Sequence, residues 1–82
     1  MTVDKILNDR KITHGSFTDN SRVSQGLKAI IRQELDPSAN TVHREALEAI
    51  CLKISRICQN PNFKDHWDDI AGYATLASKK CE

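Results

Sequence analysis

The fold is decided by the stretch TVHREALEAICLKISRICQ, which spans Thr41–Gln59. Its apolar residues recur three and four positions apart, and this spacing places side chains on one side of an α-helix. Asn40 before the stretch and Pro61 after it are residue types that mark helix boundaries. The sequence therefore predicts a helix from about Thr41 to Gln59. Its expected core face consists of Ala46, Leu47, Ile50, Cys51, Ile54, Ile57 and Cys58.

Two helices are predicted before this stretch. A short one covers about Val3–Asp9, takes Thr2 as its N-cap, and precedes a polar break at residues 11–15. A longer one begins at Ser16, where Ser16 and Asp19 form a capping-box pattern, and runs to about Glu34. The residues expected to be buried in these two helices are Val3, Ile6, Leu7, Val23, Leu27, Ile30, Ile31 and Leu35.

One helix is predicted after it, from about Phe63 to Lys79, with Asn62 as its cap. No alternating strand pattern of useful length is present, so the expected fold is all-α. Residues 1–82 should form a single domain, a small antiparallel helical bundle of one short and three longer helices. The residues expected to be buried in the last helix are Trp67, Ile70, Ala71, Ala74, Ala77 and Ser78.

The composition fits one folded, soluble domain, because 39% of the 82 residues are hydrophobic and 28% are charged. A formal net charge of +1 argues against nucleic acid as the main partner, since DNA binders rely on an excess of basic residues. No apolar run approaches the roughly 18 residues of a membrane span, and the N-terminus lacks the apolar segment of a signal peptide. We therefore expect a cytoplasmic protein with no membrane partner.

The three cysteines show no metal-binding pattern, because no two of them are spaced as C-x-x-C. Cys51 and Cys58 would lie about 10 Å apart along one helix, which is too far for a disulfide. We expect reduced thiols, with Cys51 and Cys58 acting as small core residues.

Five carboxylates supply the strongest chemical signal in the chain. Glu45 and Glu48 share one side of a predicted helix, and Asp65 shares one side of the next helix with Asp68 and with Asp69. Hard cations such as Mg²⁺ take oxygen ligands, so two such pairs are suited to holding Mg²⁺ against a phosphate-bearing ligand. A solvated acidic face, with Asp65 as a charge at a helix N-terminus, is the simpler explanation for any one of them.

Apolar residues lie among these acids. Leu52 is on the side of its helix opposite the main apolar stripe, and Gly72, Tyr73 and Leu76 accompany the acids of the last helix. Such residues on a supposed solvent face indicate that another helix packs there. In so short a chain that helix is expected to come from a second copy, which predicts a homo-oligomer.

Two segments resemble known families. The spacing Glu45-x-x-Glu48 followed by Asp65-x-x-Asp68 resembles the E-x-x-E…E-x-x-D signature of the MazG-like all-alpha nucleoside triphosphate pyrophosphatases. The pair Lys53-x-x-Arg56, followed by the run Asp69–Ala74, is similar to a K-x-x-R…D-L-x-x-Y-A run in related phage nucleotide-associated proteins. Residues 13–17, together with residues 65–73, are also similar to small, functionally uncharacterised phage proteins.

The resemblance implies a helical bundle that often dimerises, binds Mg²⁺ and cleaves a nucleoside triphosphate between its α and β phosphates. This chain departs from the signature in having Asp rather than Glu at position 65. Asp69 belongs to the most specific part of the resemblance, and we expect it to matter most. The implied metal ligands are Glu45, Glu48, Asp65, Asp68 and Asp69, and the expected nucleotide-binding residues are Lys53, Arg56, His14 and Tyr73.

The functional hypothesis is a phage-like protein of the host cytosol that binds a phosphorylated nucleotide with Mg²⁺, with hydrolysis to monophosphate and pyrophosphate as the reaction it would catalyse. Two alternatives stay open. One is a nucleotide sponge that binds without turnover. The other is an interaction or inhibitor protein that contacts a host factor through its acidic helical face.

Overall fold

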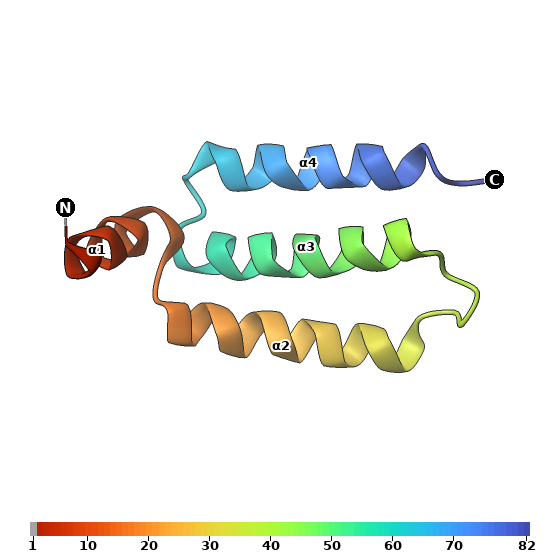
Figure 1. The fold of residues 1–82 in the computed structure, drawn as a ribbon, viewed down its shortest axis with the longest axis horizontal. Helices are drawn as coiled ribbons and strands as arrows, with labels where there is room; N and C mark the ends of the chain where they lie inside the picture. The colour runs from red at the N-terminus through yellow and green to blue at the C-terminus, as the bar shows by residue number, and fades with distance from the viewer. Residues whose placement is uncertain (1) are drawn as a thin grey trace.

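The fold is an all-α arrangement of four helices, as the sequence predicts. The computed structural model describes residues 2–82, and within that range it contains no strand. Helices α2, α3 and α4 lie side by side in one antiparallel layer with α3 in the middle, and α1 crosses one end of the layer (Figure 1). The helices are α1 (Val3–His14), α2 (Phe17–Glu34), α3 (Thr41–Gln59) and α4 (Lys64–Ser78).

Helix α1 is longer than predicted, because it continues through the expected break and ends at His14. Thr2 caps its start by accepting a hydrogen bond from the Lys5 backbone N–H at 3.2 Å, as expected. No proline or glycine interrupts the chain before Gly15, whose φ of 79° ends the helix. The predicted end at Asp9 was therefore wrong.

The caps of the later helices agree with the sequence at two of three positions. Ser16 accepts from the Asp19 N–H at 3.5 Å, and Asn40 accepts from the His43 N–H at 2.8 Å. At α4 the N-cap is Phe63 and no side chain caps the helix, so the predicted role of Asn62 was wrong.

The core differs most from expectation. Among the described residues, Ala46 and Cys51 are the buried hydrophobic side chains, and the other buried residues are polar. A single layer of three helices leaves two faces open, so much of the apolar arc of α3 points at neither neighbour. The residues expected in the core that are exposed instead are Val3, Ile6, Leu7, Ile30, Ile54, Cys58, Trp67, Ala71, Ala74 and Ser78.

Small side chains line the contact between α2 and α3. Ser24 and Ser55 are 3% and 0% exposed, and Cys51 is 2% exposed. The Ser55 hydroxyl donates to the Leu52 carbonyl oxygen at 2.6 Å, so its burial leaves no unpaired donor. None of the helices in residues 2–82 combines the length and apolar character that crossing a membrane requires.

Candidate functional site

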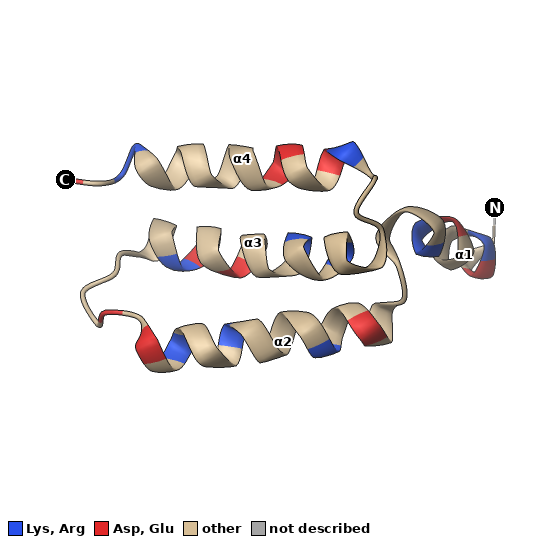
Figure 2. Cartoon of the chain, turned by 180° about the vertical axis from the view of Figure 1, so that it is seen from behind, with Lys and Arg blue, Asp and Glu red and all other residues tan. Residues whose placement is uncertain are grey.

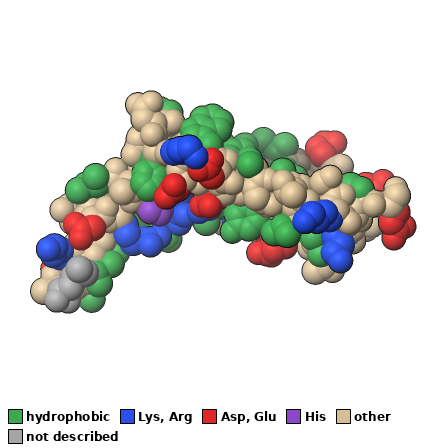
Figure 3. All heavy atoms as spheres, turned by 90° about the horizontal axis from the view of Figure 1, so that it is seen from above, with side chains coloured by type: hydrophobic (Ala, Val, Ile, Leu, Met, Phe, Trp, Pro, Cys, Tyr) green, Lys and Arg blue, Asp and Glu red, His purple; other side chains and the backbone are tan. Residues whose placement is uncertain are grey.

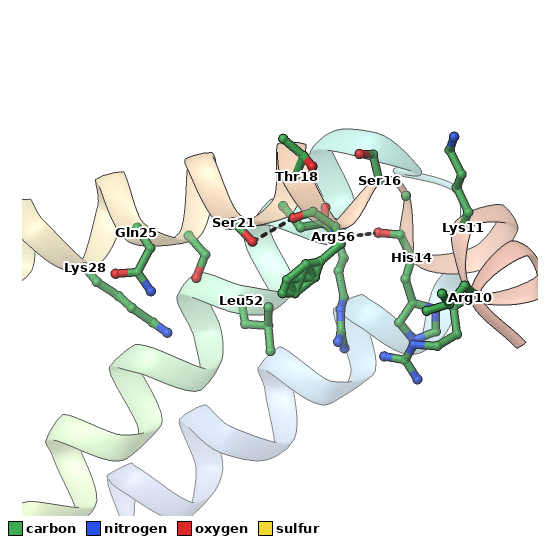
Figure 4. Close-up of a pocket in the computed structure, with 15 residues that line it drawn as sticks. Arg10, Lys11, His14, Ser16, Thr18, Ser21, Gln25, Lys28, Leu52 and Arg56 are labelled. Atoms are coloured by element: carbon green, nitrogen blue, oxygen red, sulfur yellow. Dashed lines mark hydrogen bonds between the residues drawn. The ribbon is translucent and has the colours of Figure 1, made fainter. Parts of the chain in front are cut away.

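A groove of about 830 Å³ opens where α1 meets α2 and α3. Fifteen residues line it, and none of them is acidic. Arg10, Lys11, Lys28 and Arg56 supply positive charge, and none of these four forms a salt bridge within the described chain. Figure 4 shows the side chains of Arg10 and Arg56 converging beside the ring of His14, whereas Lys11 points away. We call this region the cationic groove.

The turn between α1 and α2 builds one wall of the cationic groove. Gly15 has a positive φ, and a Cβ atom at this position would collide with the side chain of Gln59. Asn20, which is 7% exposed, donates from Nδ2 to the His14 carbonyl oxygen at 2.6 Å. These contacts hold the end of α1 against the end of α3, and they bring His14 to the groove.

Aromatic rings close the same end of the layer. His66 is 1% exposed, and its ring lies 5.0 Å from that of His14 and 4.8 Å from that of Phe63, measured between ring centroids. Its Nε2 lies 2.9 Å from the Thr13 carbonyl oxygen. A carbonyl can only accept, so Nε2 carries the proton of that hydrogen bond. This bond ties α4 to the end of α1.

Burial and positive charge shape the electrostatics of the groove. Burial lowers the pKa of Arg56, and the charge of Arg10 lowers it further, while Asp69 and Tyr73 act in the opposite direction. Burial also lowers the pKa of His14, with Arg56 and then Arg10 as the next contributors. Clustered cations repel one another, so an anion in the groove would relieve this repulsion.

Several predicted nucleotide-binding residues share this region. Lys53 Nζ lies 2.8 Å from an Asp69 carboxylate oxygen, and the Asp69 carboxylate raises the pKa of Arg56 against the larger effects of burial and Arg10. The charges of Arg56 and Lys53 both lower the pKa of His14. Of the four residues expected to bind nucleotide, His14 and Arg56 line the cationic groove, whereas Lys53 and Tyr73 do not.

The predicted metal ligands are not brought together within one chain. Because α3 and α4 are antiparallel, the acids of α4 lie beside the basic end of α3 and away from its glutamates (Figure 2). Glu48 faces α2 and pairs with Arg32 at 3.3 Å, and Asp68 pairs with Lys64 at 2.5 Å. Glu45 and Asp65 are exposed.

No group of three or more His, Cys, Asp or Glu side chains over residues 2–82 is positioned to hold a metal ion. Each of three predicted ligands instead has a basic partner: Glu48 has Arg32, Asp68 has Lys64 and Asp69 has Lys53. In the described chain, these three acids therefore lie next to basic side chains rather than next to one another.

Four residues of this region could not be found by their pattern. Arg10 and Lys28 belong to separate helices and to no motif, and only the fold places them in one groove. Asn20 and His66 are isolated polar residues whose burial appears only in the structure. A partial signal existed for Asn20, because it precedes Val23 by three positions and Leu27 by seven, so it shares the side of α2 that carries the predicted stripe.

A family profile described as a domain of unknown function (DUF6378) matches residues 2–80. The chain belongs to this family. The match includes all four helices, so the cationic groove lies entirely within the DUF6378 domain. Comparisons with curated proteins and with solved structures found no match.

Proposed function

We propose that this DUF6378 protein binds a phosphorylated nucleotide and holds the phosphates in the cationic groove. The observation that carries the proposal is the set of cations, Arg10, Lys28 and Arg56, that line a groove without any acid. The net charge of the whole chain is only +1, so the positive charge is concentrated in this groove rather than spread over the surface. Arginine suits phosphate because its planar group donates two parallel hydrogen bonds.

The rest of the groove suits the nucleoside part of the ligand. Phe17 lines the groove with 78% of its surface exposed, and an exposed aromatic ring next to cations favours stacking with a base. The hydroxyl groups of Ser16 and Thr18 also line the groove and can donate to phosphate or sugar oxygens. The groove thus offers both an anion site and a stacking surface.

Mg²⁺ enters this proposal with the nucleotide. Three of the five acids that the MazG-like resemblance assigns to the metal pair with separate basic residues, so no step of the proposal uses a metal held by one chain. Nucleoside triphosphates carry Mg²⁺ on their own phosphates, and such ions keep several of their waters.

Isothermal titration with nucleosides and their mono-, di- and triphosphates tests the proposal, with and without Mg²⁺. We expect affinity to rise with the number of phosphates and to fall as salt is added. Release of monophosphate and pyrophosphate would indicate a hydrolase, and binding without release would indicate a sponge. Equal affinity for nucleoside and triphosphate would contradict the phosphate site. A complete lack of binding would favour the interaction protein.

A matched pair of variants on α1 locates the site. Arg10→Gln removes a groove cation, whereas Lys5→Gln removes an exposed charge of the same helix that does not line the groove. A charged hydrogen bond contributes about 1.5–3 kcal/mol, so Arg10→Gln should weaken triphosphate binding about tenfold or more. Lys5→Gln should change it little. Equal effects of the two variants would place the ligand elsewhere.

A further inference from the structure

The layer of α2, α3 and α4 has one apolar face. Each helix carries a stripe of apolar residues spaced three and four apart, the spacing that keeps side chains on one side. The other face carries the cationic groove. Figure 3, which views the molecule from above, shows basic side chains gathered with a histidine on the lower side near α1, and hydrophobic side chains on both sides of the layer. The apolar face consists of Val23, Leu27, Ile30, Leu47, Ile50, Ile54, Trp67, Ala71 and Ala74.

Contacts between the helices fix which side of α3 this face occupies. Glu48 pairs with Arg32 of α2, and Lys53 pairs with Asp69 of α4. The side of α3 that carries Glu48 therefore faces α2, and the side that carries Lys53 faces α4. At 100° per residue, Ile54 points at neither neighbour and lies opposite Arg56. An apolar hollow of about 350 Å³, lined by Leu47, Ile50 and Ser78 among others, places the matching side of α4 on the same face.

The apolar face is uncovered in the single chain. Ile30 is 61% exposed, Trp67 is 54% exposed, and Ile54 at the middle of the central helix is 36% exposed. The Trp67 indole N–H already donates to the Pro61 carbonyl oxygen at 2.9 Å. Burying the ring would therefore leave no donor without a partner.

The dimensions of the chain show how much surface lacks cover. The Cα radius of gyration is 14.3 Å, against about 12 Å for a compact chain of this length. The accessible surface is 6002 Å², whereas a compact monomer of 9.2 kDa exposes about 4,900 Å². The excess of about 1,100 Å² is of the size that one partner buries in a standard protein interface, about 800 Å².

We propose that a second copy of this chain covers the apolar face, so that two three-helix layers pack face to face. Among the described residues, Ala46 and Cys51 are the buried hydrophobic side chains, and so small a core stabilises a fold weakly. The folded chain therefore needs a partner that buries its apolar face. A second copy is the partner that is always present. The three stripes carry no charge, so the same surface can pack against itself across a two-fold axis.

This interface lies opposite the one that the sequence favoured. Leu52, Gly72 and Leu76 were expected to hold the dimer, yet Leu52 lines the cationic groove. In the proposed dimer both grooves face outward and stay open. The dimer therefore does not depend on nucleotide binding, and each proposal can fail without the other.

Sedimentation velocity and thermal melts over a hundredfold range of chain concentration test the proposal on the wild-type protein. We expect a dimer at tens of micromolar, and a melting midpoint that rises with concentration, because association stabilises the folded state. The emission of Trp67, the one tryptophan in the chain, should shift to longer wavelength as dilution exposes the ring. A folded monomer with a midpoint independent of concentration would overturn the proposal and assign the face to a different partner.

A matched pair of substitutions locates the interface. Ile54→Ala trims the centre of the apolar face, whereas Leu76→Ala trims a residue that is 56% exposed on the other face. We expect the dissociation constant of the dimer to rise about tenfold or more with Ile54→Ala and to stay within about twofold with Leu76→Ala. Both variants are mild enough to keep the helices. Dissociation caused by Leu76→Ala and not by Ile54→Ala would move the interface to the groove side and overturn the proposal.

Discussion

Lys53 Nζ lies 2.8 Å from an Asp69 carboxylate oxygen, and this ion pair joins the second half of α3 to the first half of α4. The lysine side chain is only 13% exposed, whereas that of the acid is 46% exposed. A desolvated ammonium group is stabilised by a nearby opposite charge, so Asp69 is the natural partner of Lys53. The two residues come from the two segments that resemble phage nucleotide-associated proteins.

Asp69→Asn should strengthen nucleotide binding when Mg²⁺ is absent. The Lys53 hydrogen bond lowers the pKa of Asp69, so the carboxylate is charged at neutral pH and opposes an anion near Arg56. Removing that charge should tighten triphosphate binding about two- to fivefold at low salt. Isothermal titration of wild type and variant measures the difference.

Asp65→Asn is the control, because it removes the same charge from an exposed position of the same helix that forms no ion pair within residues 2–82. Its effect on binding should be smaller. Loss of all Mg²⁺-dependent binding in Asp69→Asn would show instead that Asp69 holds the metal, as the carboxylate pattern of the sequence predicted.

His14 should make the protein less stable in mild acid. Burial and the nearby Arg56, Arg10, His66 and Lys53 lower its pKa in the folded chain. A lowered folded pKa means that the unfolded chain binds the proton more tightly. The stabilisation is therefore complete above the unfolded value of about 6.5 and is lost as the pH falls through the folded pKa.

Thermal melts followed by circular dichroism, from about pH 7.5 to pH 5.5, measure this effect. His14→Gln should flatten the decline of the melting midpoint. Parallel profiles for wild type and His14→Gln would mean that another group controls the acid sensitivity.

The helices were predictable because their signals are local. Ser16 and Asn40 cap as expected, and the periodic stretch Thr41–Gln59 is a helix over its full predicted length. The early break failed because polar residues such as Lys11 and His14 permit a helix as readily as a loop, and only Gly15 stops it.

Periodicity identified the apolar sides of the helices but not what lies against them. Ile54 and Trp67 belong to strong stripes. Both are exposed in the single chain because the stripes of α2, α3 and α4 lie on the same face of the layer. The groove could be predicted only in part. Arg56 belongs to a motif, whereas Arg10 and Lys28 join it in the groove only through the path of the chain.

Asn20→Ala should destabilise the protein by about 1–3 kcal/mol, because it removes the buried hydrogen bond to the His14 carbonyl oxygen. Urea unfolding at a fixed chain concentration gives the change in free energy. Asn62→Ala, at an exposed position whose side chain forms no hydrogen bond within residues 2–82, should change stability by less than about 0.5 kcal/mol. Similar values for the two variants would show that the contact between Asn20 and the end of α1 is not needed for folding.

Alanine should have opposite effects at two glycines. Gly15→Ala places a Cβ in a backbone conformation of φ 79° and against the side chain of Gln59, so it should destabilise the fold by about 1–3 kcal/mol or more. Gly72→Ala places a Cβ within a helix where no atom lies within 4 Å, so it should stabilise the fold by up to about 1 kcal/mol. Urea unfolding of both variants at one chain concentration tests the pair.

A neutral Gly15→Ala would contradict the close contact between Gly15 and Gln59 that forms one wall of the cationic groove. A strongly destabilising Gly72→Ala would mean that another chain packs against that side of α4, which is where the sequence alone placed the dimer contact.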